Sequence, residues 1–210
     1  MPRKQFFQTI LIIFSFTISL CSRILAESAD STLYKIKMHN EEIKRASMLL
    51  DINPSILKAV IYTERTMNYD WEDETFDNIL AHAGLNSSLG FCQVKLKTAY
   101  WIERQVNDSK STFYPGDKYK GILRVSKSPE EIISKLNSDS KNILYAAAYI
   151  KIMLLRWSKS GFSIDDRPEI IGTLYFAGLF TRQGEEREPR QNPLASRYGL
   201  MVKENILLFR

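Results

Sequence analysis

Apolar positions recur every three or four residues along most of this chain, which is the spacing of amphipathic α-helices. The segment 138–161 shows this spacing most clearly, because one face carries Ile143, Ala146, Ala147, Ile150, Met153, Leu154 and Trp157. Within it, three consecutive alanines allow close approach of a neighbouring helix. The pattern predicts helices over 38–52, 54–67, 94–106, 128–136, 138–161 and 168–180, and a last one beginning near Ala195.

Local signals mark several helix ends. Asn53 followed by Pro54 gives an N-cap and then a proline at the first helical position. Ser128 precedes Pro129 and two glutamates, which is a helix start of the same kind. Gly161 can end the longest helix, since glycine adopts the left-handed conformation common after a C-cap.

The segments between the predicted helices are polar and long. Residues 68–78 are acidic and aromatic, 107–127 contain a turn at 114–117 and a predicted short strand at 120–125, and 181–193 form a charged loop. The chain shows no repeat and no interdomain linker. It is therefore predicted to be a mainly α single domain with irregular loops and a short β element. Loops of this length often carry a functional site.

The N-terminus has the features of an export signal. Arg3 and Lys4 precede an apolar run at 6–20. Ala26 and Ser28 then supply small residues three positions and one position before a cleavage point. The sequence therefore predicts export, with the periplasm as the expected compartment.

Cleavage after Ser28 divides the chain into a signal at 1–28 and a domain at 29–210. An uncleaved membrane anchor is an alternative, because the apolar run comes close to the length that spans a bilayer. Lipidation at Cys21 is another alternative, although Leu20 before it is bulkier than the small residue a bacterial lipoprotein signal usually carries. A Gram-positive cell surface is also compatible with the sequence.

Composition excludes several functional classes. The chain has 210 residues, of which 44% are hydrophobic and 25% charged, as in folded globular proteins. From residue 27 onward, 26 basic residues are scattered among 24 acidic ones, so no nucleic-acid partner is predicted. Only His39 and His82 are present, without ligand spacing, and Cys92 is the one cysteine beyond the signal. No metal, cofactor or intrachain disulfide is expected.

The helix predicted from Pro54 carries an unusual carboxyl group. Leu57, Val60 and Ile61 form an apolar stripe, and the next position on that stripe is Glu64. Burial can raise the pKa of a carboxyl by about 3–5 units. A carboxyl that keeps its proton can act as the general acid in glycoside cleavage. The alternative is a helix-end glutamate that reaches water or pairs with a neighbouring base such as Arg65.

Three later stretches follow this glutamate in a fixed order. They are SSLGFCQVKLKTA (87–99), KNILYAAAYI (141–150) and TLYFAG (173–178). Together with Glu64, and over about residues 53–180, they resemble the lytic transglycosylases of the lysozyme-like superfamily. In that family a catalytic glutamate ends a helix, a Gly-Leu-Met-Gln-like segment lines the cleft, an Asn-Ile…Tyr-Leu helix supports the core and an Ala-Tyr-Asn-x-Gly segment closes the site.

The resemblance implies a lysozyme-like fold and a role for each matching residue. It makes Glu64 the acid and then the base, and it makes Gln93 a hydrogen-bonding partner of the sugar chain. The backbone of Gly90 and Phe91 is expected close to the substrate, and Tyr175 is expected to orient Glu64 or the substrate. The implied reaction cleaves the β-1,4 bond between N-acetylmuramic acid and N-acetylglucosamine in peptidoglycan and forms 1,6-anhydro ends. The implied partners are glycan strands and an envelope-spanning machine.

The sequence departs from the family pattern at several places. Arg65 replaces the usual serine, Cys92 the methionine before the glutamine, and Phe176 the asparagine after the tyrosine, and an acidic insertion occupies 70–77. Cys92 is expected to be a small buried apolar residue rather than a nucleophile. Asn142 is expected to be structural.

Three other interpretations stay open. A carboxylate within 70–77 could activate water, which would make the protein a hydrolase of the lysozyme type. The departures at Arg65 and Phe176 favour a non-catalytic peptidoglycan-binding protein. A helical adaptor with 181–193 as its partner surface requires an exposed Glu64.

Overall fold

The computed structural model describes residues 27–67 and 87–210, and helices account for most of them. The described part contains eight α-helices, one two-stranded antiparallel hairpin and two short 3-10 helices. The α-helices are α2 (Ala29–Met38), α3 (Asn40–Leu49), α4 (Pro54–Met67), α6 (Leu96–Gln105), α7 (Pro129–Leu136), α8 (Asp139–Lys159), α9 (Pro168–Ala177) and α10 (Arg197–Asn205). The hairpin pairs β1 (Ser88–Leu89) with β2 (Val94–Lys95), and the 3-10 helices are η1 (Asp117–Tyr119) and η2 (Ile206–Phe209).

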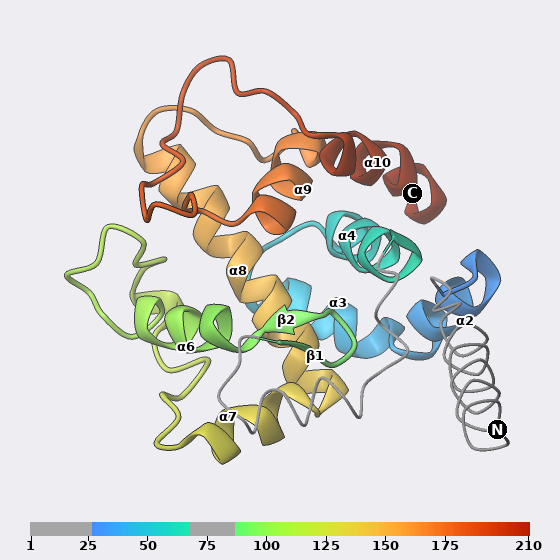
Figure 1. Ribbon diagram of the computed structural model, residues 1–210, viewed down its shortest axis with the longest axis horizontal. Coiled ribbons are helices and arrows are strands. Elements are labelled where there is room, and N and C mark those ends of the chain that lie inside the picture. Colours follow the sequence, from blue (N-terminus) through green and yellow to red (C-terminus); the bar gives the residue numbers. More distant parts are fainter. Residues whose placement is uncertain (1–26, 68–86) are drawn as a thin grey trace, which may run out of the picture.

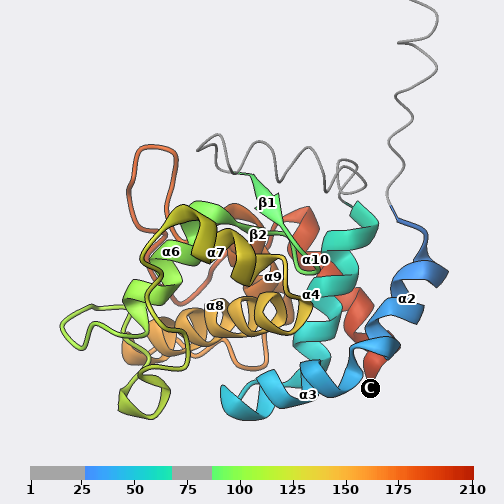
Figure 2. The same ribbon diagram turned by 90° about the horizontal axis from the view of Figure 1, so that it is seen from below.

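Helix α8 runs through the middle of the molecule, and the other elements surround it (Figure 1). Helices α3, α6, α7 and α9 pack against it. The three consecutive alanines of α8, residues 146–148, are fully buried. One hydrophobic core joins these helices, so the described residues form a mainly helical single domain. Figure 2 shows the same core helix lying beneath α6 and α7.

Helix α4 begins where the sequence signal places it. The Asn53 side chain accepts a hydrogen bond from the backbone N–H of Ser55 at 2.9 Å, and Pro54 is the first helical residue. The helix packs against α2, α3, α10 and η2. The Ser55 hydroxyl donates to the carbonyl oxygen of Phe209 at 2.6 Å, so the C-terminal end of the chain closes over the start of α4. This packing fixes the direction in which α4 carries Glu64.

Most predicted helices are confirmed, and one segment needs correction. The single helix predicted over 38–52 is α3 alone, and a separate helix, α2, precedes it with His39 between the two. The sequence pattern missed α2 because only Thr32 and Ile36 of that helix are buried. Two buried positions do not produce a visible apolar stripe.

The predicted strand at 120–125 is wrong. The backbone there turns, with Gly121 at φ +79°, and only Leu123 among these residues is buried. The short β element lies instead at 88–95, on either side of Gly90. A left-handed glycine interrupts the extended conformation that a strand at 120–125 requires.

A buried ion pair ties the first described residues to α4. The Arg65 side chain is 1% exposed, and its Nε lies 2.6 Å from Glu27 Oε2. Burial opposes ionisation of Glu27, but hydrogen bonds from Lys35, Ser31 and Arg65 outweigh it and hold the pKa of this carboxyl below its usual value. The pair therefore persists as a buried carboxylate and guanidinium.

Residues that the sequence pattern assigns to the end of the export signal belong to the folded unit. Glu27 is the counter-ion of Arg65, and the Ser28 hydroxyl accepts a hydrogen bond from the Ser31 N–H at 3.2 Å, which caps α2. The rest of the predicted signal, residues 1–26, lies outside the described residues. Across 27–67 and 87–210, no helix combines the length and the apolar character needed to cross a membrane.

Candidate active site

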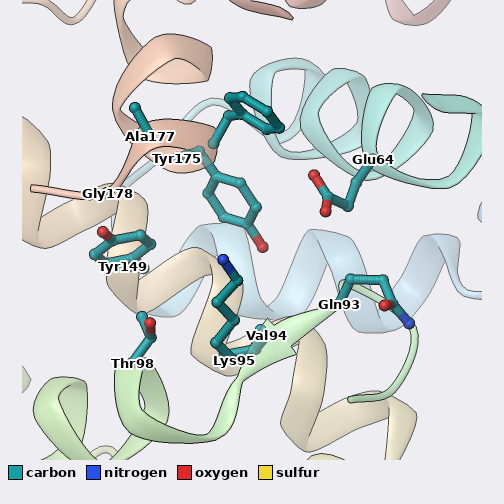
Figure 3. A pocket seen from close by; sticks show the side chains of 10 residues that line it. Glu64, Gln93, Val94, Lys95, Thr98, Tyr149, Tyr175, Ala177 and Gly178 are labelled. Carbon is teal, nitrogen blue, oxygen red and sulfur yellow. The ribbon is translucent and has the colours of Figure 1, made fainter. Parts of the chain in front are cut away.

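Glu64 lies in the last turn of α4, and it lines a cavity of about 280 Å³. The cavity lies between α4, the hairpin with the start of α6, and the C-terminal end of α9 (Figure 3). Its walls are Glu64, Gln93, Val94, Lys95, Thr98, Tyr149, Tyr175, Phe176, Ala177 and Gly178. Among these residues, Glu64 carries the one carboxyl group. The structure thus brings Glu64, Gln93 and Tyr175, three of the predicted site residues, to one cavity.

The environment of Glu64 favours its protonated form. Burial raises the pKa of the carboxyl above its usual value, and two weaker effects oppose this: a hydrogen bond from Tyr198 and the positive charge of Lys95. The Tyr198 hydroxyl donates to Glu64 Oε2 at 2.8 Å. Figure 3 shows the ammonium group of Lys95 and the carboxyl of Glu64 pointing into the same space. The carboxyl can therefore donate a proton, and the two neighbours stabilise the carboxylate that remains.

Tyr198 is a site residue that the sequence pattern did not identify. It belongs to α10, and Tyr198 and Val202 of this helix and Ile206 at the start of η2 are buried at a spacing of four residues. A hydroxyl on an otherwise apolar stripe needs a buried partner, which is the same signal that drew attention to Glu64. Burial and the neighbouring Glu64 raise the pKa of the phenol well above its usual value, so it stays a hydrogen-bond donor.

Tyr175 reaches the cavity but bonds a different group from the one expected. Its hydroxyl donates to the carbonyl oxygen of Cys92 at 3.0 Å, which links α9 to the residues just before β2. The tyrosine that contacts the Glu64 carboxyl is Tyr198. The ring of Tyr175 still lines the cavity (Figure 3), and its predicted contact with substrate remains a prediction.

The loop between β1 and β2 contains the other predicted site residues, Gly90, Phe91 and Gln93, and of these three only Gln93 lines the cavity. Gln93 lines the cavity in a left-handed conformation at φ +51°. Gly90 and Phe91 belong to the same loop but are not among the residues that line the cavity. A Cβ at Gly90 would lie 2.2 Å from the carbonyl oxygen of Leu136, so only glycine fits there. Phe91 packs against the Arg65 guanidinium, 4.7 Å from its ring centre.

Asn142 holds this loop in place from α8. Its side-chain oxygen accepts a hydrogen bond from the Cys92 N–H at 2.7 Å, and its side-chain nitrogen donates to the carbonyl oxygens of Leu89 and Leu136, each at 2.8 Å. The amide is fully buried and has no contact with the cavity. Asn142 therefore has the structural role expected from the sequence.

Two of the departures from the family pattern lie away from the cavity. Arg65 extends toward Glu27 and donates to the carbonyl oxygen of Phe91 at 3.0 Å. Cys92 is fully buried, and burial raises the pKa of its thiol, which disfavours the nucleophilic thiolate. Phe176 is the departure that does line the cavity, and it is 61% exposed.

Replacing Tyr198 by phenylalanine tests the electrostatic account of Glu64. The hydrogen bond from Tyr198 lowers the pKa of this carboxyl, so Tyr198→Phe is expected to raise it further. The measurement is a carbon-13 NMR titration of the Glu64 side-chain carboxyl in both proteins. Tyr175→Phe is the matched control, because its hydroxyl bonds the Cys92 carbonyl instead. An unchanged or lowered Glu64 pKa in Tyr198→Phe contradicts this account.

The described residues offer no metal site, and sequence comparisons identify no relative. Across 27–67 and 87–210, no three His, Cys, Asp or Glu side chains gather closely enough to hold a metal ion. The acidic segment at 70–77, which the hydrolase interpretation invokes, lies outside the described residues. No protein-family model matches the chain, and no curated protein matches its sequence.

Proposed function

We propose that this protein is an exported lytic transglycosylase with a lysozyme-like fold that cleaves the β-1,4 bond between N-acetylmuramic acid and N-acetylglucosamine in peptidoglycan. The observation that carries the proposal is the environment of the Glu64 carboxyl. Burial raises its pKa, and Glu64 lines a cavity together with Gln93 and Tyr175. The order of the sequence motifs after Glu64 supports it as well.

The proposed reaction uses Glu64 twice. In the first step its carboxyl gives a proton to the oxygen that links the two sugars, and the bond from that oxygen to the muramic acid C1 breaks. The acetamido group of the substrate stabilises the positive charge that develops at C1. In the second step the Glu64 carboxylate takes the proton of the sugar 6-hydroxyl, and the 6-oxygen bonds to C1. The 1,6-anhydro ring closes and Glu64 regains its proton.

This scheme needs one acid, and Glu64 is the one acidic residue among the described residues that line the cavity. A second carboxylate is unnecessary, because the substrate supplies its own stabilising group. Lys95 and Tyr198 both favour the ionised form of Glu64, so they support the state between the two proton transfers. Gln93 is proposed to hydrogen-bond the sugar chain, and Tyr175 to position the substrate.

The products distinguish this reaction from hydrolysis. Digestion of murein by the purified protein is expected to release muropeptides with 1,6-anhydro ends, which are 18 mass units lighter than the hydrolysed products because no water is added. Mass spectrometry of the released muropeptides measures this directly. Reducing ends in place of anhydro ends would identify a lysozyme-type hydrolase instead.

A second candidate function is non-catalytic binding of peptidoglycan. The observation that favours it is Phe176, an exposed aromatic ring at the cavity where the resembled family has an asparagine. A pulldown with insoluble murein together with a turbidity assay separates the two, because a binder sediments with murein without clearing it. A helical adaptor is less well supported, since it requires an exposed Glu64.

The proposed cellular setting follows from the N-terminal sequence and from family analogy. Export to the periplasm brings the protein to its substrate, and the proposed partners are glycan strands and an envelope-spanning machine whose passage needs a local opening. The even mixture of acidic and basic residues beyond residue 27 gives no support for a nucleic-acid partner.

A further inference from the structure

A second cavity, of about 430 Å³, lies between α8, α9 and the segment that joins α9 to α10. This segment is the long loop between those two helices in Figure 1. Ala177 lines both this cavity and the one that contains Glu64, so the two adjoin at the C-terminal end of α9. The charge of Arg187, which lines the second cavity, also acts on the hydroxyl of Tyr149, which lines the first.

The outer wall of the second cavity has a defined conformation. Phe180 and Glu186 form an isolated antiparallel bridge, and the Arg187 N–H donates to the carbonyl oxygen of Leu179 at 2.8 Å. The Glu186 carboxylate pairs with Arg156 of α8 at 2.7 Å. The loop is therefore held against the body of the protein.

The inner wall contains a buried donor without an acceptor. Trp157 of α8 lines the cavity and is 2% exposed, and its indole N–H has no hydrogen-bond partner in the described part of the chain. Buried polar groups in proteins are nearly always hydrogen-bonded. A ligand carbonyl or carboxylate oxygen in this cavity can supply the missing acceptor.

The remaining lining combines apolar and charged side chains. Leu174 and Pro193 provide apolar surface, and Leu194 does so while remaining 82% exposed. The guanidinium groups of Arg187 and Arg190 form no ion pair within 27–67 and 87–210, and both side chains are exposed. Two glutamates also line the cavity: Glu186 is paired with Arg156, and Glu188 places one carboxylate beside the two guanidinium groups. The excess of positive charge and the apolar residues together favour a small ligand with carboxylate groups and short apolar side chains.

We propose that this second cavity binds the stem peptide of the muramic acid whose glycosidic bond lies over Glu64. The inference rests on the proposed function. A stem peptide is short, carries alanine methyl groups and free carboxylates, and leaves the glycan at the muramic acid itself. A strand seated in the first cavity thus directs its peptide past Ala177 toward Trp157, Arg187 and Arg190. Recognition of the peptide restricts cleavage to glycan that still carries it.

The test compares two substrates, intact murein and glycan strands whose stem peptides an amidase has removed. The double variant Arg187→Ala/Arg190→Ala is expected to cleave intact murein at least about five-fold more slowly than wild type and to cleave the peptide-free strands at the wild-type rate. The matched control is Arg124→Ala/Arg182→Ala, which removes two exposed arginines that line neither cavity. An equal loss on both substrates, or no loss on intact murein, overturns the inference while the proposed function stands.

A binding measurement tests the same inference without catalysis. Free stem peptide is expected to shift the indole N–H resonance of Trp157 in nitrogen-15 spectra of wild type and of Glu64→Gln, and to leave it unshifted in Arg187→Ala/Arg190→Ala. The Trp157 resonance is assigned with Trp157→Phe. No shift in wild type overturns the inference. A shift in a protein that cleaves neither substrate sustains peptide binding and rejects the proposed enzyme activity.

Discussion

Replacing Glu64 by glutamine is expected to reduce murein cleavage by roughly 10²–10⁴-fold or more, the usual contribution of a positioned proton-transfer group. Glutamine keeps the size of the side chain and can still accept the hydrogen bond from Tyr198, but it cannot give or take the proton. The measurement is the initial rate of muropeptide release by wild type and variant on the same murein. Equal rates would remove Glu64 from the mechanism and leave peptidoglycan binding as the better account.

The stability of the same variant provides an internal control. The folded state holds the Glu64 proton above the usual pKa of 4.5, whereas the unfolded chain releases it there, so rising pH favours the unfolded state through this group. Glu64→Gln removes that penalty. We therefore expect the variant to unfold at an equal or higher temperature than wild type at neutral pH, and the two to converge below about pH 4.5. A lost activity with a lower melting temperature at pH 7 would indicate damage to the fold instead.

Replacing Glu27 by glutamine is expected to lower the free energy of unfolding by about 3–5 kcal/mol, since it leaves the Arg65 guanidinium buried without its counter-ion. The effect depends on pH in a defined direction. The pKa of Glu27 is lowered by folding, so the carboxylate contributes stability above its usual pKa of 4.5 and loses it as pH falls through the lower folded value. Urea unfolding at pH 7 and at pH 3 measures both statements.

Two controls accompany the Glu27 variant. Glu41→Gln breaks an ion pair of similar length with Lys44 on the surface, and it is expected to leave the stability unchanged, because exposed pairs contribute little. The double variant Glu27→Leu/Arg65→Met removes both buried charges and is expected to recover part of the loss. If Glu27→Gln and Glu41→Gln unfold at the same urea concentration, the buried pair has no special weight.

The helical framework and the position of the acid could be predicted from the sequence because both depend on local pattern. The stripe that contains Leu57 and Ile61 predicts α4, and the same stripe predicts that Glu64 faces inward. The order of the motifs after Glu64 predicts that Gln93 and Tyr175 lie at the same site, and both line the cavity that contains Glu64. The helix starts at Pro54 and Pro129 follow from capping residues that act over one turn.

The features that the sequence did not reveal depend on contacts between distant segments. Tyr198 meets Glu64 across 134 positions of chain, and its hydroxyl gives no local sign of that partner. Arg65 follows Glu64 directly in the sequence, yet its side chain pairs with Glu27, 38 positions earlier in the chain. The requirement for glycine at position 90 comes from Leu136 and Asn142, which occupy the space that a Cβ there would take. Such placements are decided by tertiary packing.

If the export signal predicted from the sequence is cleaved, the burial of Glu27 links the position of the cut to folding. A signal peptidase that cut after Ser28 would release a chain lacking both the counter-charge of Arg65 and the cap of α2. A cut after Ala26, also a small residue, would instead leave Glu27 as the first residue and keep its ion pair with Arg65. A shift of two residues in the predicted cleavage site would therefore decide whether the buried Arg65 guanidinium keeps its counter-ion.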